Sequence, residues 1–139
     1  MTTFESAVTK ATCNDSEIFG LLSDLNNVEK IKDRIPQGMI KELEFDTDSC
    51  RFSIDPVGRV GLQIVEREPS KMIKFAADRS PVDFNLWIQL KQVAENDTRI
   101  KVTLKADLNP VIKMMASKPI ENFVNKLAEI LSNLPYKHP

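Results

Sequence analysis

Few residues in this chain have the types and spacing that catalysis needs. Histidine is the side chain most often used for general acid–base catalysis, and the single histidine, His138, is the penultimate residue. Because chain termini are usually poorly ordered, we expect His138 to have no catalytic role. The two cysteines, Cys13 and Cys50, are too far apart for a metal-binding Cys-x-x-Cys pair. The sequence therefore predicts no catalytic residue, no metal site with the usual ligand sets and no cofactor.

The remaining short motifs have structural interpretations. Asp46 and Asp48 could suggest a calcium site, but an isolated Asp-x-Asp between two predicted strands is typical of a turn. No glycine-rich phosphate loop is present, and Gly58 and Gly61 indicate a turn and a bend in a strand. Gly20 lies inside a predicted helix, where we expect it to permit close packing on a sheet.

Length and composition set the protein class. The chain has 139 residues, which predicts one domain over residues 1–139 with a core of its own. Its 19 Lys and Arg and 20 Asp and Glu give a net charge of −1, without a run of basic residues, so nucleic-acid binding is not expected. No apolar run approaches the roughly 18 residues of a membrane span. The absence of a signal-like N-terminus and the two cysteines predict a cytoplasmic protein with reduced thiols, the alternative being an exported protein with one disulfide.

The first quarter of the chain predicts one strand and two short helices. Residues 3–12 read as a strand with Phe4 and Val8 as its apolar anchors. Asn14 then has the type of an N-cap, and Glu17 stands where a capping box needs a carboxylate. Apolar residues follow at helical spacing, with an interruption that separates two short helices.

From Met39 the hydrophobic period changes from helical spacing to two. Six runs follow, each bounded by turn residues. Because no helical segment separates these runs, and parallel neighbours need a long crossover, they predict an antiparallel meander. Clean alternation indicates that one face is buried and the other exposed. The exposed face is expected to carry Gln89, Lys91, Lys101, Thr103 and Lys105.

Trp87 alternates with the inward-facing residues of its run, so it is expected on the outer face of the sheet. Either the chain's own ends cover it there, or it marks an interface, where tryptophan is enriched. In the second case a homodimer or a protein partner would dock on the outer sheet face near Trp87.

A long C-terminal helix is expected to cover the buried face. Asn109-Pro110 predicts its start, because Asn is a preferred N-cap and Pro a preferred first helical residue. The helix should reach about Asn133. Pro119 falls inside it and is expected to divide it, with Ser117 capping a main helix from about Lys118. The apolar stripe of this helix is expected to comprise Ile112, Met115, Phe123, Leu127, Ile130 and Leu134.

This order of elements resembles the START-like (SRPBCC) helix-grip superfamily, which includes the polyketide cyclase/dehydrase and lipid-transport groups and the pollen-allergen lipid carriers. The resemblance covers the whole chain, and it rests on the layout, on the capped helix at Asn14 and on Asn109-Pro110. It implies an α+β helix-grip fold, in which a curved antiparallel sheet (β-α-α-β6-α) wraps around a long C-terminal helix. It further implies a cavity that holds lipids, quinones or aromatic polyketides. Members of the superfamily include enzymes, carriers and protein-binding modules.

The inward faces of the last four predicted strands carry almost no polar residue, which suits both a filled core and an apolar pocket. The resemblance favours the pocket, so the leading hypothesis is the binding of a small hydrophobic molecule. The alternatives are a cyclase/dehydrase-type enzyme and a protein-interaction module with a closed cavity. Arg34, Arg59 and Arg79 lie near predicted element ends, where a cavity mouth would be, although such arginines are mostly solvated. The candidate ligand-binding residues are Leu62, Ile64, Phe75, Phe84, Leu86, Met115 and Phe123. Phe75, Phe84 and Phe123 are expected to line one continuous space.

Overall fold

The computed structural model describes residues 1–34, 40–54 and 58–136. Two short strands open the chain and are followed by a helical segment: β1 (Thr2–Glu5), β2 (Thr9–Ala11), α1 (Asp15–Leu22), η1 (Leu25–Asn27), α2 (Val28–Ile31) and η2 (Lys32–Arg34). Six further strands and the long helix complete it: β3 (Lys41–Phe45), β4 (Ser49–Ile54), β5 (Gly58–Glu68), β6 (Met72–Ala77), β7 (Phe84–Ala94), β8 (Asp97–Ala106) and α3 (Pro110–Ser132).

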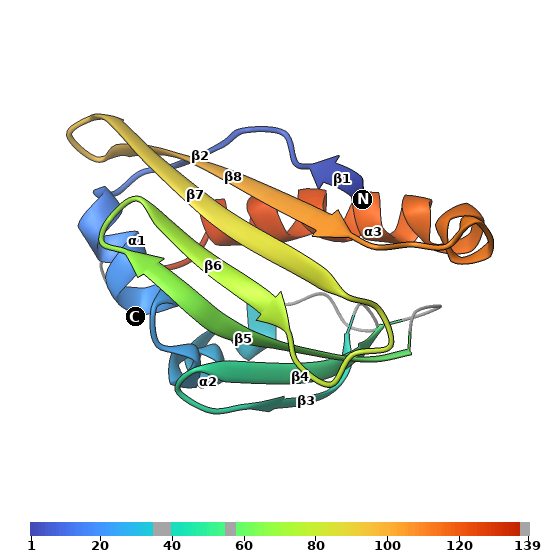
Figure 1. Cartoon of the computed structure of the whole chain (residues 1–139). Coiled ribbons are helices and arrows are strands. Elements are labelled where there is room, and N and C mark those ends of the chain that lie inside the picture. The colour runs from blue at the N-terminus through green and yellow to red at the C-terminus, as the bar shows by residue number, and fades with distance from the viewer. Residues whose placement is uncertain (35–39, 55–57, 137–139) are drawn as a thin grey trace.

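The strands form one curved sheet in the order β1-β8-β7-β6-β5-β4-β3, with β2 also paired to β8 (Figure 1). Every strand pair within the described ranges is antiparallel. Helix α3 lies along one face of the sheet and contacts β8, β1 and β2. The predicted α+β helix-grip architecture, with its six-stranded meander, is therefore confirmed.

The predicted first strand is wrong in its continuity, because it is broken at Ser6. The Val102 N–H donates to the Ser6 hydroxyl at 2.9 Å, so a side chain replaces one ladder partner. The register also shifts by one residue. Glu5 lies opposite Thr103, so an uninterrupted ladder would place Thr9 opposite Arg99, but Thr9 lies opposite Ile100. An extra residue of this kind is a bulge, which bends a strand. Val8, predicted as an anchor, is consequently exposed.

The cap of α1 is confirmed, whereas the predicted role of Gly20 is wrong. Asn14 is the N-cap and forms a capping box with Glu17, whose carboxylate accepts from the Asn14 N–H at 3.0 Å. The buried face of the helix is made by Ile18 and by two leucines. A Cβ placed on Gly20 would meet no atom within 4 Å, so this glycine makes no close approach to the sheet.

Helix α3 is one continuous helix, which corrects the predicted division at Pro119. Asn109 caps its start through the side chain, as expected. Ser117 caps no second segment, because its hydroxyl donates to the Lys113 carbonyl one turn earlier, at 2.5 Å. Packing on both sides of the proline holds the helix together, since Ala116 is buried on one side and Phe123 packs against the core on the other. Tertiary packing of this kind routinely overrides local preference.

The buried stripe of α3 is displaced from the predicted one. Met115 is 58% exposed, while the centre of the contact with the sheet is made by smaller side chains. Phe123, Leu127 and Ile130 pack at the edge of this contact and are partly buried. Small residues at the centre allow the helix backbone to approach the sheet closely. The buried residues of the helix are Ala116, Val124, Ala128 and Leu131.

The outer sheet face carries Trp87, as predicted, and among the described residues its ring is covered by lysine side chains. Two lysines lie over its ring, with Lys74 Nζ at 5.4 Å and Lys105 Nζ at 5.7 Å from the centroid. Thr103, predicted as exposed, is buried directly opposite Trp87 in the ladder and donates to Gln89 Oε1 at 2.9 Å. Cation–π contacts and a cross-strand hydrogen bond thus stabilise this part of the outer face.

Candidate functional site

Two apolar cavities lie between the sheet and α3, with volumes of about 150 Å³ and about 60 Å³. The larger lies toward the helical segment of residues 21–28, and the smaller toward the middle of α3 at Pro119. Among the described residues every lining side chain is hydrophobic apart from one hydroxyl and one thiol. The structure therefore combines a packed core with open apolar space.

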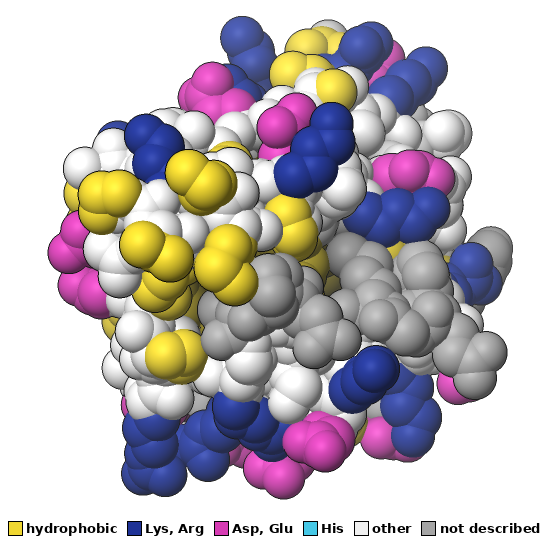
Figure 2. Space-filling view, turned by 90° about the vertical axis from the view of Figure 1, so that its right-hand side faces the viewer, with side chains coloured by type: hydrophobic (Ala, Val, Ile, Leu, Met, Phe, Trp, Pro, Cys, Tyr) yellow, Lys and Arg dark blue, Asp and Glu magenta, His cyan; other side chains and the backbone are white. Residues whose placement is uncertain are grey.

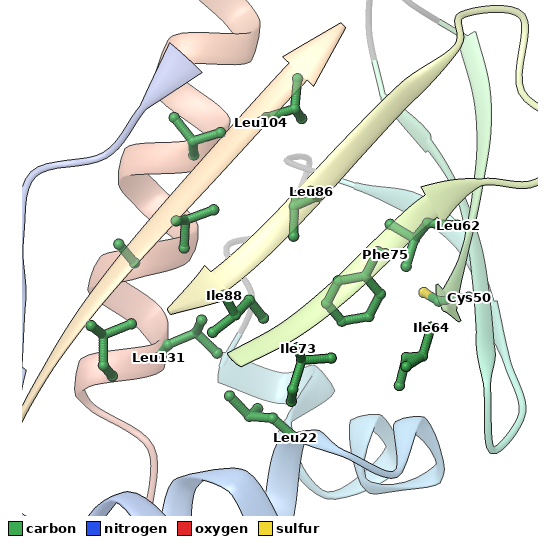
Figure 3. Packing of buried hydrophobic residues seen from close by; sticks show 14 of the residues in the cluster. Leu22, Cys50, Leu62, Ile64, Ile73, Phe75, Leu86, Ile88, Leu104 and Leu131 are labelled. Atoms are coloured by element: carbon green, nitrogen blue, oxygen red, sulfur yellow. The ribbon is translucent and has the colours of Figure 1, made fainter. Parts of the chain in front are cut away.

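The larger cavity is built by the inner faces of β3 to β7 together with α3, α1, η1 and α2. Figure 3 shows Cys50, Leu62, Phe75 and Leu86 side by side on neighbouring strands of the sheet. The described lining residues are Leu22, Leu25, Val28, Ile40, Leu43, Cys50, Phe52, Leu62, Phe75, Leu86, Ile88, Phe123, Leu127, Ile130 and Leu131.

The smaller cavity is built by β4, β5, β7, β8, the β6–β7 loop and the middle of α3. Ser80 supplies the one hydroxyl among its described lining residues. These residues are Phe52, Ile54, Val60, Leu62, Ser80, Val82, Phe84, Leu86, Leu104, Ala106, Pro119, Ile120 and Phe123.

The structure distributes the seven predicted ligand-binding residues unevenly. Leu62, Leu86 and Phe123 line both cavities, Phe75 lines only the larger, and Phe84 lines only the smaller. The three phenylalanines thus line two neighbouring cavities, and the one continuous space expected along them stays a prediction. Ile64 and Met115 line neither cavity, because Ile64 is packed within the core and Met115 faces outward from α3. Their assignment to a ligand site has no support in the geometry.

Several lining residues were not among the predicted candidates although the sequence carried a signal for them, and two of them lie on β4. Phe52 and Cys50 alternate along β4, and both are buried on its inner side. The same period of two that placed Leu62 and Leu86 therefore placed these residues as well. Residues such as Leu25 and Val28 had no comparable signal, because a short helical segment contacts the cavity only through its tertiary position.

The electrostatics of the cavities are those of an uncharged environment. No Asp, Glu, His, Lys or Arg occurs among the described residues that line them. Burial raises the pKa of the Cys50 thiol to about 12, so this cysteine is a neutral thiol at physiological pH. No described lining group can exchange a proton near neutral pH, which general acid–base catalysis requires.

The three arginines considered for a cavity mouth have other surroundings. Arg59 lies 3.4 Å from Glu44 and 3.7 Å from Glu42, and it donates to the backbone carbonyl of Glu42. Arg34 donates to a carbonyl at the end of α3 at 3.5 Å. Arg79 is exposed, with a positive φ of 55° in the β6–β7 loop. None of them is a described lining residue of either cavity.

Other kinds of site receive no support from the described part of the chain. It holds no group of three or more His, Cys, Asp or Glu side chains that could bind a metal ion. His138, predicted to have no role, lies outside the described residues. Asp46 accepts hydrogen bonds from the N–H groups of Asp48 and Ser49, which is the predicted turn chemistry. Within the described ranges no helix is long and apolar enough to cross a membrane.

An exposed hydrophobic patch occupies the outward face of the first turns of α3. Its residues, Val111, Met114 and Met115, follow each other at helical spacing and are all solvent-exposed. Figure 2 shows the end of the molecule where α3 begins, with hydrophobic side chains gathered in one area and charged side chains around it. The patch is separate from the lining of both cavities.

Comparison with known proteins identifies solved structures that have a similar fold. No family model matches the chain, and no curated protein matches it in sequence. Among solved structures, norcoclaurine synthase from Thalictrum flavum has a TM-score of 0.74 at 13% identity, covering 99% of this chain and 87% of that one. A protein from Thermus thermophilus has a TM-score of 0.68 at 14% identity, with 94% of each chain covered.

A third similar structure, the protein XoxI from Bacillus cereus, has a TM-score of 0.64 at 10% identity, covering 95% of this chain and 94% of that one. Norcoclaurine synthase has also been solved in complex with dopamine and hydroxybenzaldehyde. At these identities the likeness establishes a shared fold, and the helix-grip resemblance predicted from the layout is confirmed at that level.

Proposed function

We propose that this protein binds a small, uncharged hydrophobic molecule in the space between the sheet and α3. The observation that carries the proposal is the pair of cavities whose described walls are almost wholly hydrophobic. Such space excludes ordered water and favours an apolar occupant, since a site needs several polar partners to hold a water molecule. Concave, mostly apolar cavities of this kind are typical of small-molecule sites.

The same walls favour binding over catalysis. A charged ligand group would lose its hydration inside the cavities without finding a partner there. A cyclase/dehydrase-type reaction would need polar groups deep in the space, and the described walls offer only Ser80 and the neutral Cys50 thiol. The likeness to norcoclaurine synthase supports a single-ring aromatic ligand class, since a structure of that enzyme with this fold contains dopamine and hydroxybenzaldehyde. Lipids, quinones and polyketides are larger occupants that the two cavities would have to accommodate together.

Two further expectations accompany the proposal. Cys50 is a reduced, buried thiol, which fits the predicted cytoplasmic location. A homodimer or protein partner at the outer sheet face near Trp87 stays a prediction, with the ring already covered by Lys74 and Lys105.

The test is native-state binding of an apolar, environment-sensitive dye, displaced by an uncharged aromatic compound. In the variant Leu86→Phe a larger side chain intrudes on both cavities, so dye binding should fall strongly while the fold, checked by circular dichroism, persists. The matched control is Met114→Ser with Met115→Ser, which removes most of the exposed patch on α3 and should leave dye binding unchanged. Loss of binding in the patch variant instead would favour an interaction surface and would contradict the proposal.

A further inference from the structure

Two aromatic rings stand at the boundary between the cavities. Phe52 on β4 and Phe123 on α3 are stacked, with ring centroids 6.0 Å apart and planes inclined by 22°. Of the described residues, four line both cavities: Phe52, Phe123, Leu62 and Leu86. The leucines belong to the central strands β5 and β7 and form the floor. The ring pair instead connects the sheet to the helix and belongs to the lining of both cavities.

The volumes set the size of a ligand. An apolar cavity of about 150 Å³ is known to take up benzene, and the larger cavity here has that volume. The smaller, at about 60 Å³, is too small for the same ring. A long hydrocarbon or a fused ring system would have to extend through both cavities, and the stacked rings lie in its way.

We propose that the Phe52–Phe123 pair determines ligand size, restricting the occupant to an uncharged molecule of about one aromatic ring held in the larger cavity. Displacing or removing the Phe123 ring would join the cavities and admit longer molecules. The inference rests on the proposed ligand binding and deepens it, by naming the ligand class and the residues that select it. Phe123 is the side of the pair that can yield, because it is only partly buried whereas Phe52 is buried.

The experiment measures affinities of benzene and the n-alkylbenzenes, lengthened one methylene at a time, by calorimetry. Each buried methylene strengthens binding about fourfold, the equivalent of about 0.8 kcal/mol. In the wild type this gain should stop once the larger cavity is full. In Phe123→Ala it should continue over further methylenes, because the alkyl chain can enter the smaller cavity.

A matched control distinguishes the effect of joining the two cavities from the effect of enlarging one of them. Phe75→Ala removes the same atoms from the larger cavity alone. It should therefore increase the alkyl chain length up to which affinity rises by less than Phe123→Ala does. Phe84→Ala enlarges only the smaller cavity. It should increase that chain length more in the Phe123→Ala background than in the wild type. Such coupling between the two substitutions is the mark of a shared space.

The outcomes distinguish the two proposals. If affinity stops rising at the same alkyl chain length in wild type, Phe75→Ala and Phe123→Ala, with binding intact, the role of the ring pair is overturned and the proposed function stands. No binding by any alkylbenzene in any variant would overturn the proposed function itself. Where Phe123→Ala does not fold, Phe123→Leu still removes the ring stacking and should raise the limit by fewer methylenes, and an unchanged limit in that folded variant would overturn the inference.

Discussion

Ile73 and Ile88 provide an internal comparison between filled core and cavity wall. They have the same side chain and lie directly opposite each other on β6 and β7. Ile73 is 0% exposed and lines no described cavity, whereas Ile88 is 5% exposed and lines the larger one. Truncation of a buried isoleucine to alanine typically costs about 2–5 kcal/mol. We expect Ile73→Ala in the upper part of that range and Ile88→Ala in the lower part.

The expected difference follows from missing contacts. Each pair of non-bonded carbon atoms contributes about 0.1–0.2 kcal/mol, and atoms that face a void have no partner on that side. If Ile88 lacks about ten of the contacts that Ile73 makes, its truncation should cost about 1–2 kcal/mol less.

The measurement is the free energy of unfolding in urea, followed by circular dichroism, with the denaturant slope compared between variants. A common slope shows that the same surface is exposed on unfolding in each case. A cost for Ile88→Ala that equals or exceeds the cost for Ile73→Ala would refute the reasoning, since it would mean that Ile88 packs against a filled interior.

Three further predictions concern single residues. Gly20→Ala should raise the free energy of unfolding by up to about 1 kcal/mol in urea titrations, because alanine is the better helix former and its Cβ meets no atom within 4 Å. Gly61→Ala should lower the free energy of unfolding by about 1–3 kcal/mol, because the Cβ would lie 1.9 Å from a backbone oxygen. Equal effects of the two substitutions would contradict this contrast. Hydrogen bonds from the Ser49 hydroxyl and from nearby backbone N–H groups lower the pKa of Asp46 below its ordinary value of 3.8, so its contribution to stability is present above that value and is lost as the pH falls through the lowered pKa. Wild type should therefore lose more stability than Asp46→Asn in this acid range, and parallel pH profiles of the urea midpoint would count against the assignment. Because burial raises the pKa of the Cys50 thiol to about 12, a thiol reagent at neutral pH should modify it slowly in the native chain and rapidly in urea, as followed by mass spectrometry; rapid native labelling would show an accessible thiolate.

Much of the fold could be predicted from the sequence because local pattern and tertiary packing agree over most of the chain. The period of two across β5 to β8 and the Asn109-Pro110 helix start each specify an element without knowledge of its neighbours. Where the two levels disagree, packing prevails. Pro119 is a helix breaker by type, yet α3 continues through it because residues on both sides pack on the sheet. The break at Ser6 depends on a hydrogen bond to Val102, a partner distant in sequence.

The candidate site was harder to predict, since the same apolar residues can build a filled core or a cavity. Leu62, Phe75 and Leu86 were placed on the inner face by alternation alone, which was sufficient to put them on cavity walls. Whether space remains beside them depends on how closely α3 approaches the sheet. Met115 was misplaced because a helical stripe defined by large residues does not reveal that alanines occupy the centre of the contact.

The central claim, that the space between the sheet and α3 holds a small hydrophobic molecule, is tested most directly by methyl NMR of the wild-type protein with benzene. Intermolecular NOEs locate the ligand without any substitution. We predict NOEs from benzene to the methyl groups of Leu62, Leu86 and Ile88, which line the larger cavity, and none to Ile73, which is packed in the core. NOEs confined to the exposed methyl group of Met115, or none at a saturating benzene concentration, would contradict the account.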